Sequence, residues 1–157
     1  MGATKGDLMA QMLVERDKLL LAVAGLSAED AQRVAIGEWS VKDIVAHIAA
    51  WDAEAARRLE LIGAGRESEI VDFGEGEIDE WNARAVAQRR DVRWDEVLAE
   101  LHEARERLLE ALRSLSDEQI AATDSRVPIA EWLPQWTQQH DGHHASEVLA
   151  WRKREHV

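Results

Sequence analysis

Residues 138–151 read Gln-Gln-His-Asp-Gly-His-His-Ala-Ser-Glu-Val-Leu-Ala-Trp, and this stretch holds three of the six histidines in the chain. If it is helical, His140 and His144 stand four residues apart on one face, so their imidazoles can converge on one metal ion. A third ligand must come from another segment. The best candidate is His47, which lies in the apolar stretch Trp-Ser-Val-Lys-Asp-Ile-Val-Ala-His-Ile-Ala-Ala-Trp at residues 39–51. The rest of the chain is then a scaffold that brings two histidine-bearing helices together.

The spacing leaves open which histidine is the second ligand on the last helix, since His140 and His143 also share a face. We prefer His144, because His143 is then rotated by about 100° toward a flank. Carboxylates next to such a site orient the imidazoles, and large aromatic side chains line its pocket. The residues that we assign to these surroundings are Asp141, Glu147, His143, Trp51 and Trp136.

Three histidines without cysteine suit a late divalent metal rather than Mg or Ca, with Zn and Ni as the favoured ions. A three-histidine site leaves a position open for water or substrate, as catalytic centres do. The competing interpretation is that these histidines pack in the core or lie on the surface, as we expect for His102 and His156.

The totals restrict the classes of function. A chain of 157 residues fits one domain spanning residues 1–157. The net charge of −12 argues against nucleic acid and anionic membranes as partners, because both attract basic surfaces. The chain has no cysteine, no apolar run of transmembrane length and no signal-peptide pattern at its start. We therefore expect a cytoplasmic protein with a small-molecule substrate.

Apolar residues recur at three and four positions along much of the chain, which predicts an all-α protein. The four glycines of residues 63–77 interrupt this pattern, so we expect a loop there. We expect a four-helix bundle with a crossover connection and short extra helices. The expected main helices are 7–25, 40–62, 94–115 and 133–154, with a minor helix at 78–90.

Two parts of the chain echo each other. Leu-Ser-Ala-Glu from Leu26 is repeated as Leu-Ser-Asp-Glu from Leu115, and Trp39 precedes His47 by eight residues as Trp132 precedes His140. This pattern suggests two related helix pairs about a pseudo-twofold axis, in which His47 and His140 face each other; coincidence in a chain rich in Ala, Glu and Leu is the alternative.

The start of the stretch 39–51, the segment Asp-Glu-Trp-Asn at 79–82 and the final His-x-x-x-His resemble the DinB/YfiT-like superfamily over nearly the whole chain. The superfamily includes the thiol-dependent maleylpyruvate isomerase N-terminal domain, and the chain is also similar to the ClbS/DfsB branch. The resemblance implies a four-helix bundle, often a homodimer. It also implies a divalent metal on His47, His140 and His144, although in the ClbS/DfsB branch this triad is not a dependable feature.

Two classes of function follow. In the first, the metal serves a thiol-dependent S-transferase, an isomerase or a hydrolase that acts on a small electrophile. Because the chain has no cysteine, any thiol must be a low-molecular-weight cosubstrate. In the second, the chain is a non-catalytic dimeric bundle that serves binding or stress response. A metal-independent hydrolase of the ClbS type is a third possibility.

Overall fold

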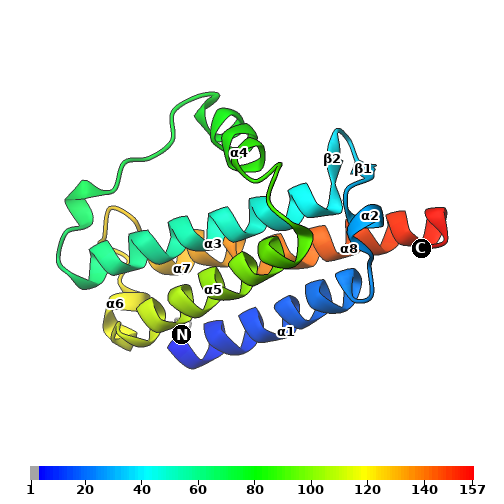
Figure 1. The fold of residues 1–157 in the computed structure, drawn as a ribbon. Coiled ribbons are helices and arrows are strands. Elements are labelled where there is room, and N and C mark those ends of the chain that lie inside the picture. The colour runs from blue at the N-terminus through cyan, green and yellow to red at the C-terminus, as the bar shows by residue number, and fades with distance from the viewer. Residues whose placement is uncertain (1–3) are drawn as a thin grey trace.

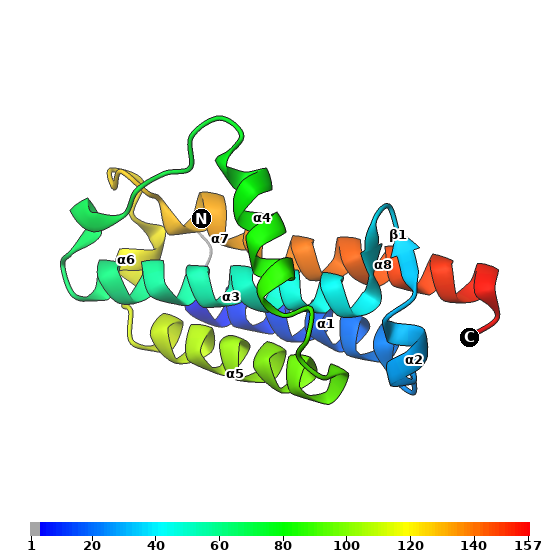
Figure 2. The ribbon, with the colours of Figure 1, turned by 45° about the horizontal axis from the view of Figure 1, so that its top comes forward.

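The computed structural model describes residues 4–157 and confirms an all-α architecture (Figures 1 and 2). Its elements are α1 Lys5–Val23, α2 Ala28–Ala31, β1 Val34–Ile36, β2 Trp39–Ser40, α3 Val41–Gly63, the 3-10 helix η1 Glu67–Glu69, α4 Glu77–Gln88, α5 Trp94–Arg113, α6 Asp117–Ala121, α7 Ile129–Trp136 and α8 Gln138–Glu155. The four long helices α1, α3, α5 and α8 form the bundle, and the shorter elements lie at its ends and along one side.

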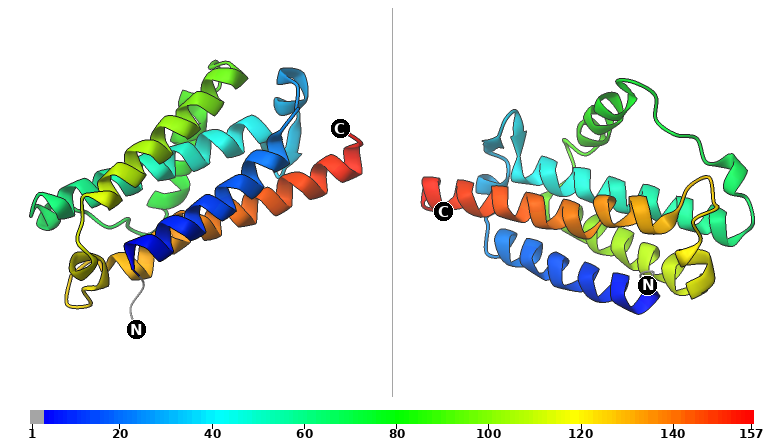
Figure 3. Two further views of the ribbon diagram at one scale, coloured as in Figure 1. Left: turned by 90° about the horizontal axis from the view of Figure 1, so that it is seen from below. Right: turned by 180° about the vertical axis from the view of Figure 1, so that it is seen from behind.

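The bundle consists of two helix pairs. Helix α3 packs mainly against α5, whereas α1 packs mainly against α8 (Figure 3). The helices within each pair run in the same direction, because the long connection 64–93 returns the chain to the end from which α3 started (Figure 1). This connection is the predicted crossover, and it carries α4. The two pairs meet along a seam, and direct contact between α3 and α8 across it is sparse.

Helix α3 begins where the sequence predicts. The Ser40 side chain accepts a hydrogen bond from the backbone N–H of Asp43, and the Asp43 carboxylate accepts one from the N–H of Ser40. This capping box satisfies two donors that the first turn leaves free. The preceding β1–β2 hairpin, with Gly37 at φ 59° in its turn, was not predicted, because strands of three and two residues are too short for alternation to show.

The predicted last helix, 133–154, was wrong at its start. The structure has two helices there, and the break falls at Thr137, with φ −118° and ψ −94°. The carbonyl oxygen of Leu133 accepts hydrogen bonds both from the Thr137 hydroxyl at 2.7 Å and from the Thr137 backbone N–H at 3.1 Å, so the last turn of α7 is closed at this residue. Pro134, expected in a first turn, lies well inside α7. The break starts α8 just before the histidines.

Gly142 lies on α8 where this helix passes close to α1. A Cβ atom at this position would lie 2.5 Å from Oε2 of Glu15, which is the mobile end of a long side chain. Replacing Gly142 with alanine should therefore displace only that carboxylate and gain helix propensity. We expect an increase in the free energy of unfolding of up to about 1 kcal/mol, measured by urea denaturation.

The matched control for this change is Gly25→Ala. Gly25 has φ 72°, so alanine is strained there although no atom obstructs its Cβ. We expect this variant to lose stability. A lower stability for Gly142→Ala would mean that Glu15 is held in place.

Candidate metal centre

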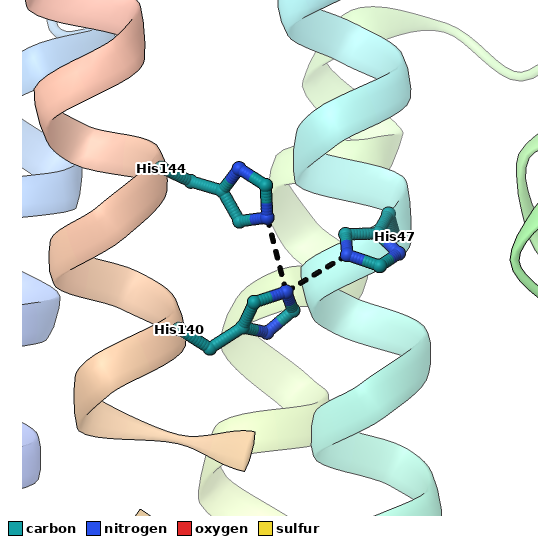
Figure 4. Close-up of side chains that lie close together, drawn as sticks. All are labelled: His47, His140 and His144. Atoms are coloured by element: carbon teal, nitrogen blue, oxygen red, sulfur yellow. Dashed lines mark hydrogen bonds between the residues drawn. The ribbon is translucent and has the colours of Figure 1, made fainter. Parts of the chain in front are cut away.

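The side chains of His47, His140 and His144 converge on one point between α3 and α8 (Figure 4). Nε2 of His140 lies 2.8 Å from Nε2 of His47 and 3.0 Å from Nε2 of His144. The three nitrogens all lie within 4.8 Å of one another. Two nitrogens bound at about 2.0–2.1 Å to a tetrahedral ion stand roughly 3.3 Å apart, so a slight opening of the triad would accommodate one.

Local folding explains this convergence. His140 and His144 are one turn apart on α8 and project toward α3. His47 is only 5% exposed and lies between Trp39 and Trp51, with ring centroids 4.9 and 6.5 Å from its own. Trp39 precedes the cap of α3 and Trp51 follows His47 by one turn. The tryptophans therefore hold the His47 ring from both sides.

All three imidazoles are held in the neutral form. Burial, assisted by the rings of His140 and His144, lowers the pKa of His47 from 6.5 to about 3. Burial and the neighbouring His144 ring also lower the pKa of His140 to about 3. Burial lowers the pKa of His144, and the carboxylate of Glu147 opposes this shift. Neutral imidazole is the form that binds metals, so the rings need lose no proton near pH 7.

Hydrogen bonding alone does not satisfy the three nitrogens. Nδ1 of His144 lies 2.7 Å from Oε1 of Glu147, and an ionised carboxylate only accepts, so this ring carries its proton on Nδ1. Nε2 of His140 holds at most one proton but stands close to both other rings. At least one short contact therefore lacks a shared proton. A cation between the nitrogens would remove this deficit.

The structure distinguishes the two candidates for the second ligand on α8. His144 directs Nε2 into the triad, whereas the side chain of His143 is 68% exposed and lies 3.4 Å from Oε1 of Glu147. Glu147 contacts both of these rings. Only His144 has a protein partner on Nδ1, because Nδ1 of His47 and of His140 is buried without one among residues 4–157.

Asp141 lies elsewhere than the sequence suggested. We expected its carboxylate to orient an imidazole, but its oxygens accept hydrogen bonds from Arg16 and Arg105 at 2.9–3.1 Å. Its direction on α8 differs from that of His140 because adjacent helical residues are rotated by about 100°. Sequence reasoning missed these arginines. The available signal was an arginine inside an apolar stripe, with Arg16 following Met12 by four residues and Arg105 following Leu101 by four.

An aromatic cluster continues from the triad along α3. Trp51 and Trp136, both assigned to the pocket from sequence, have ring centroids 4.6 Å apart. The structure adds Trp81 of α4 and Phe73 of the crossover loop, whose centroids lie 4.6 and 5.5 Å from that of Trp51. Asn82, the last residue of the Asp-Glu-Trp-Asn segment, accepts a hydrogen bond from the indole N–H of Trp51 at 2.8 Å. Helix α4 and the loop therefore cover this side of the bundle.

A cavity of about 600 Å³ lies between α1 and α8 on another side of α8. Its lining includes Gln11, Val14, Gln138 and Gly142, and it reaches the histidine cluster only through the exposed His143. We therefore place the candidate site at the three histidine nitrogens and not in this cavity.

Residues 11–148 match the sequence profile of the DinB superfamily. The chain belongs to the DinB superfamily. This match covers both histidine-bearing helices, α3 and most of α8, and it confirms the resemblance on which the sequence assignment depended. A search of curated proteins found no significant match.

Solved structures share this DinB fold at low identity. An uncharacterised protein from Escherichia coli UTI89 aligns with a TM-score of 0.83 at 14% identity, over 98% of this chain and 95% of the other. The colibactin self-resistance protein ClbS in complex with dsDNA gives 0.85 at 13%, over 98% of both chains. The sibling lethal factor precursor DfsB gives 0.82 at 15%, over 99% and 98%. At these identities the likeness establishes the fold.

The predicted exclusion of nucleic acid was wrong. ClbS, a protein of the same fold, has been solved with double-stranded DNA. The net charge of the whole chain is a poor criterion for DNA binding, because phosphates contact a local surface whose charge can differ from that total. For membranes, no helix within residues 4–157 is long and apolar enough to cross a bilayer.

Proposed function

We propose that this protein is a divalent-metal-dependent enzyme in which His47, His140 and His144 hold the ion. The observation that carries the proposal is the convergence of three neutral imidazole nitrogens from two helix pairs at 2.8–3.0 Å. Such an ion supplies Lewis-acid chemistry, which activates a thiol or water nucleophile or polarises a carbonyl group.

The donor set fits a late transition metal, with Zn and Ni favoured by three nitrogen ligands and no sulfur or carboxylate. The fit is complete at His144, where Glu147 fixes the tautomer that leaves Nε2 free. Within residues 4–157, the Nδ1 atoms of His47 and His140 have no protein acceptor. We therefore expect moderate affinity, since outer partners of this kind raise metal affinity by about 10–100-fold.

The aromatic cluster would bind the substrate. Phe73 and Trp136 are half-buried and lie against the buried ring of Trp51, which neighbours His47, and this arrangement suits a small electrophile with a flat or apolar body. The chain supplies no thiol of its own, since it has no cysteine. The nucleophile is then a low-molecular-weight thiol or water, and the reaction is an S-transfer, an isomerisation or a hydrolysis.

Metal analysis tests the proposal directly. The protein is purified without a polyhistidine tag, stripped with a chelator, and titrated with Zn²⁺ or Ni²⁺. We expect one ion per chain and a higher melting temperature on binding. In a second assay, consumption of a small thiol in the presence of an activated electrophile should fall on chelation and recover on adding metal. Protein that binds less than a stoichiometric amount of either ion contradicts the proposal.

One observation favours the alternative, a metal-independent hydrolase of the ClbS type or a non-catalytic bundle. In the described part of the chain, two of the three imidazoles have no protein acceptor on Nδ1, whereas metal-binding histidines almost always donate from this atom to a partner. Activity that survives complete chelation would support the hydrolase. Absence of both metal and turnover would support the binding protein.

A further inference from the structure

Two arginines and two aspartates form a buried ion network inside the bundle. Arg16 of α1 donates to Asp52 of α3 at 2.7 Å and to Asp141 of α8 at 3.1 Å. Arg105 of α5 donates to Asp52 at 3.0 Å and to Asp141 at 2.9 Å. Both aspartate side chains are 0% exposed and the arginines 8% and 6%. Each arginine therefore bonds both carboxylates, and the four charges sum to zero.

The network crosses the seam between the helix pairs. Arg16 belongs to the α1/α8 pair and Asp52 to the α3/α5 pair, so their bond joins the two pairs. The bond from Arg105 of the α3/α5 pair to Asp141 of the α1/α8 pair joins them a second time, with the arginine now on the other pair. Through the shared partner Arg16, Asp52 of α3 and Asp141 of α8 are also joined to each other, so the network links the two helices that carry the triad.

The two arginines occupy equivalent places in the two halves of the chain. Arg16 stands eleven residues before Ser27, and Arg105 stands eleven residues before Ser116. Both serines cap the short helix that follows a long one. The two arginines therefore follow the same internal repeat as His47 and His140, which also face each other across the seam, whereas the two aspartates do not occupy equivalent places.

The network and the triad are neighbours along both helices. Asp141 directly follows His140, and Asp52 follows His47 by five residues, about 7.5 Å along the helix axis. A change in the separation of α3 and α8 at the network would therefore also change the distances between the histidine side chains of the triad.

Stability alone is a weak reason for such a network. Buried charges lose their hydration, and well-packed apolar residues in the same place are often equally stabilising or better. The network also fixes the relative positions of the helices. Each planar guanidinium group can donate to two carboxylates only when these lie within a narrow range of positions.

We propose that the Arg16–Asp52–Arg105–Asp141 network sets the separation of α3 and α8, so that the three Nε2 atoms are held close together, a slight opening away from ligating distance, before an ion binds. Asp52 is then a positioning residue of the centre. This role rests on the proposed function insofar as the triad is a metal site, but the separation of the helices is measurable without metal.

The first test measures the seam directly. The chain has no cysteine, so spin labels can be placed at will. Labels at Arg57→Cys on α3 and Ala150→Cys on α8 report the distance between the pairs, and labels at Arg57→Cys and Glu103→Cys report the distance within the α3/α5 pair. In the metal-free protein, Asp52→Asn should broaden or shift only the first distribution. An unchanged first distribution overturns the proposal.

If Asp52→Asn does not fold, Arg16→Lys decides the question by the same measurement. Lysine keeps the charge but cannot bond two carboxylates in the fork geometry. It should give a smaller broadening between the pairs and none within the α3/α5 pair. A wild-type distribution in this variant overturns the proposal equally.

The second test measures affinity for Zn²⁺ alone by calorimetry, at a temperature where every variant is folded. Asp52→Asn should weaken binding roughly ten-fold, the lower end of the effect that residues orienting metal ligands have on affinity. Leu112→Ala, which destabilises the core far from any ligand, should leave the affinity unchanged, as should Glu60→Gln in an exposed ion pair within the α3/α5 pair. Equal affinity in Asp52→Asn and wild type overturns the positioning role. Absence of zinc binding by wild type instead overturns the proposed function, and the spin-label distances still decide the role of the network.

Discussion

Replacing His140 with alanine is expected to abolish stoichiometric binding of Zn²⁺ or Ni²⁺. His140 is the member of the triad whose Nε2 lies close to both others, at 2.8 and 3.0 Å. Its removal leaves two imidazoles on different helices, which is one donor fewer than catalytic zinc sites use. The melting temperature should then no longer respond to metal. For wild type, an ion at a hundred times its dissociation constant adds about 2.7 kcal/mol to the free energy of unfolding.

The other histidines give matched comparisons for this experiment. His47→Ala and His144→Ala should behave as His140→Ala does. His143→Ala should retain the ion, because the side chain of His143 is 68% exposed and lies outside the triad. His102→Ala on the exposed face of α5 controls for nonspecific binding. Full metal occupancy in His140→Ala would show that the triad is not the site.

Replacing Arg105 with alanine should cost about 3–5 kcal/mol of the free energy of unfolding, the largest loss that we expect from one substitution in this chain. The variant leaves Asp52 and Asp141 buried with only Arg16 to compensate two negative charges. The free energy of unfolding, measured by urea denaturation with its slope, gives the loss.

The control for this change lies half a turn further along the same helix. Arg107 forms a two-bond ion pair with Glu60 at 2.7 Å, but the two side chains are 48% and 44% exposed. Removing an exposed partner usually costs at most about 1 kcal/mol. Equal losses in Arg105→Ala and Arg107→Ala would show that the buried network contributes no more to the free energy of unfolding than an exposed ion pair does.

The predictable parts of this protein depend on local rules. The Ser40 and Asp43 capping box fixes the start of α3, and helical periodicity places His140 and His144 on one face. The position of His47 on a separate apolar helix, together with the resemblance, was enough to select the triad. These features need only the spacing of residues along one helix.

The remaining parts depend on contacts between helices. The break at Thr137 lies in the φ and ψ angles of one residue, which the periodicity of the sequence does not reveal. Arg16 and Arg105 were recognisable as arginines within apolar stripes, but the sequence does not name the carboxylates that neutralise them. Asp141 was assigned to an imidazole because it is adjacent to His140 in the chain, and the structure shows that it points to the arginines instead.

The pairing of α1 with α8 has a consequence for synthesis of the chain. Helix α1 leaves the ribosome well before α8, because α1 ends at Val23 and α8 begins only at Gln138. Until α8 emerges, Arg16 lacks Asp141, and the apolar face of α1 has no permanent cover. The α3/α5 pair can therefore assemble before α8 is made, whereas the complete bundle must wait for α8. The three histidines of the triad come together only after α8 has left the ribosome.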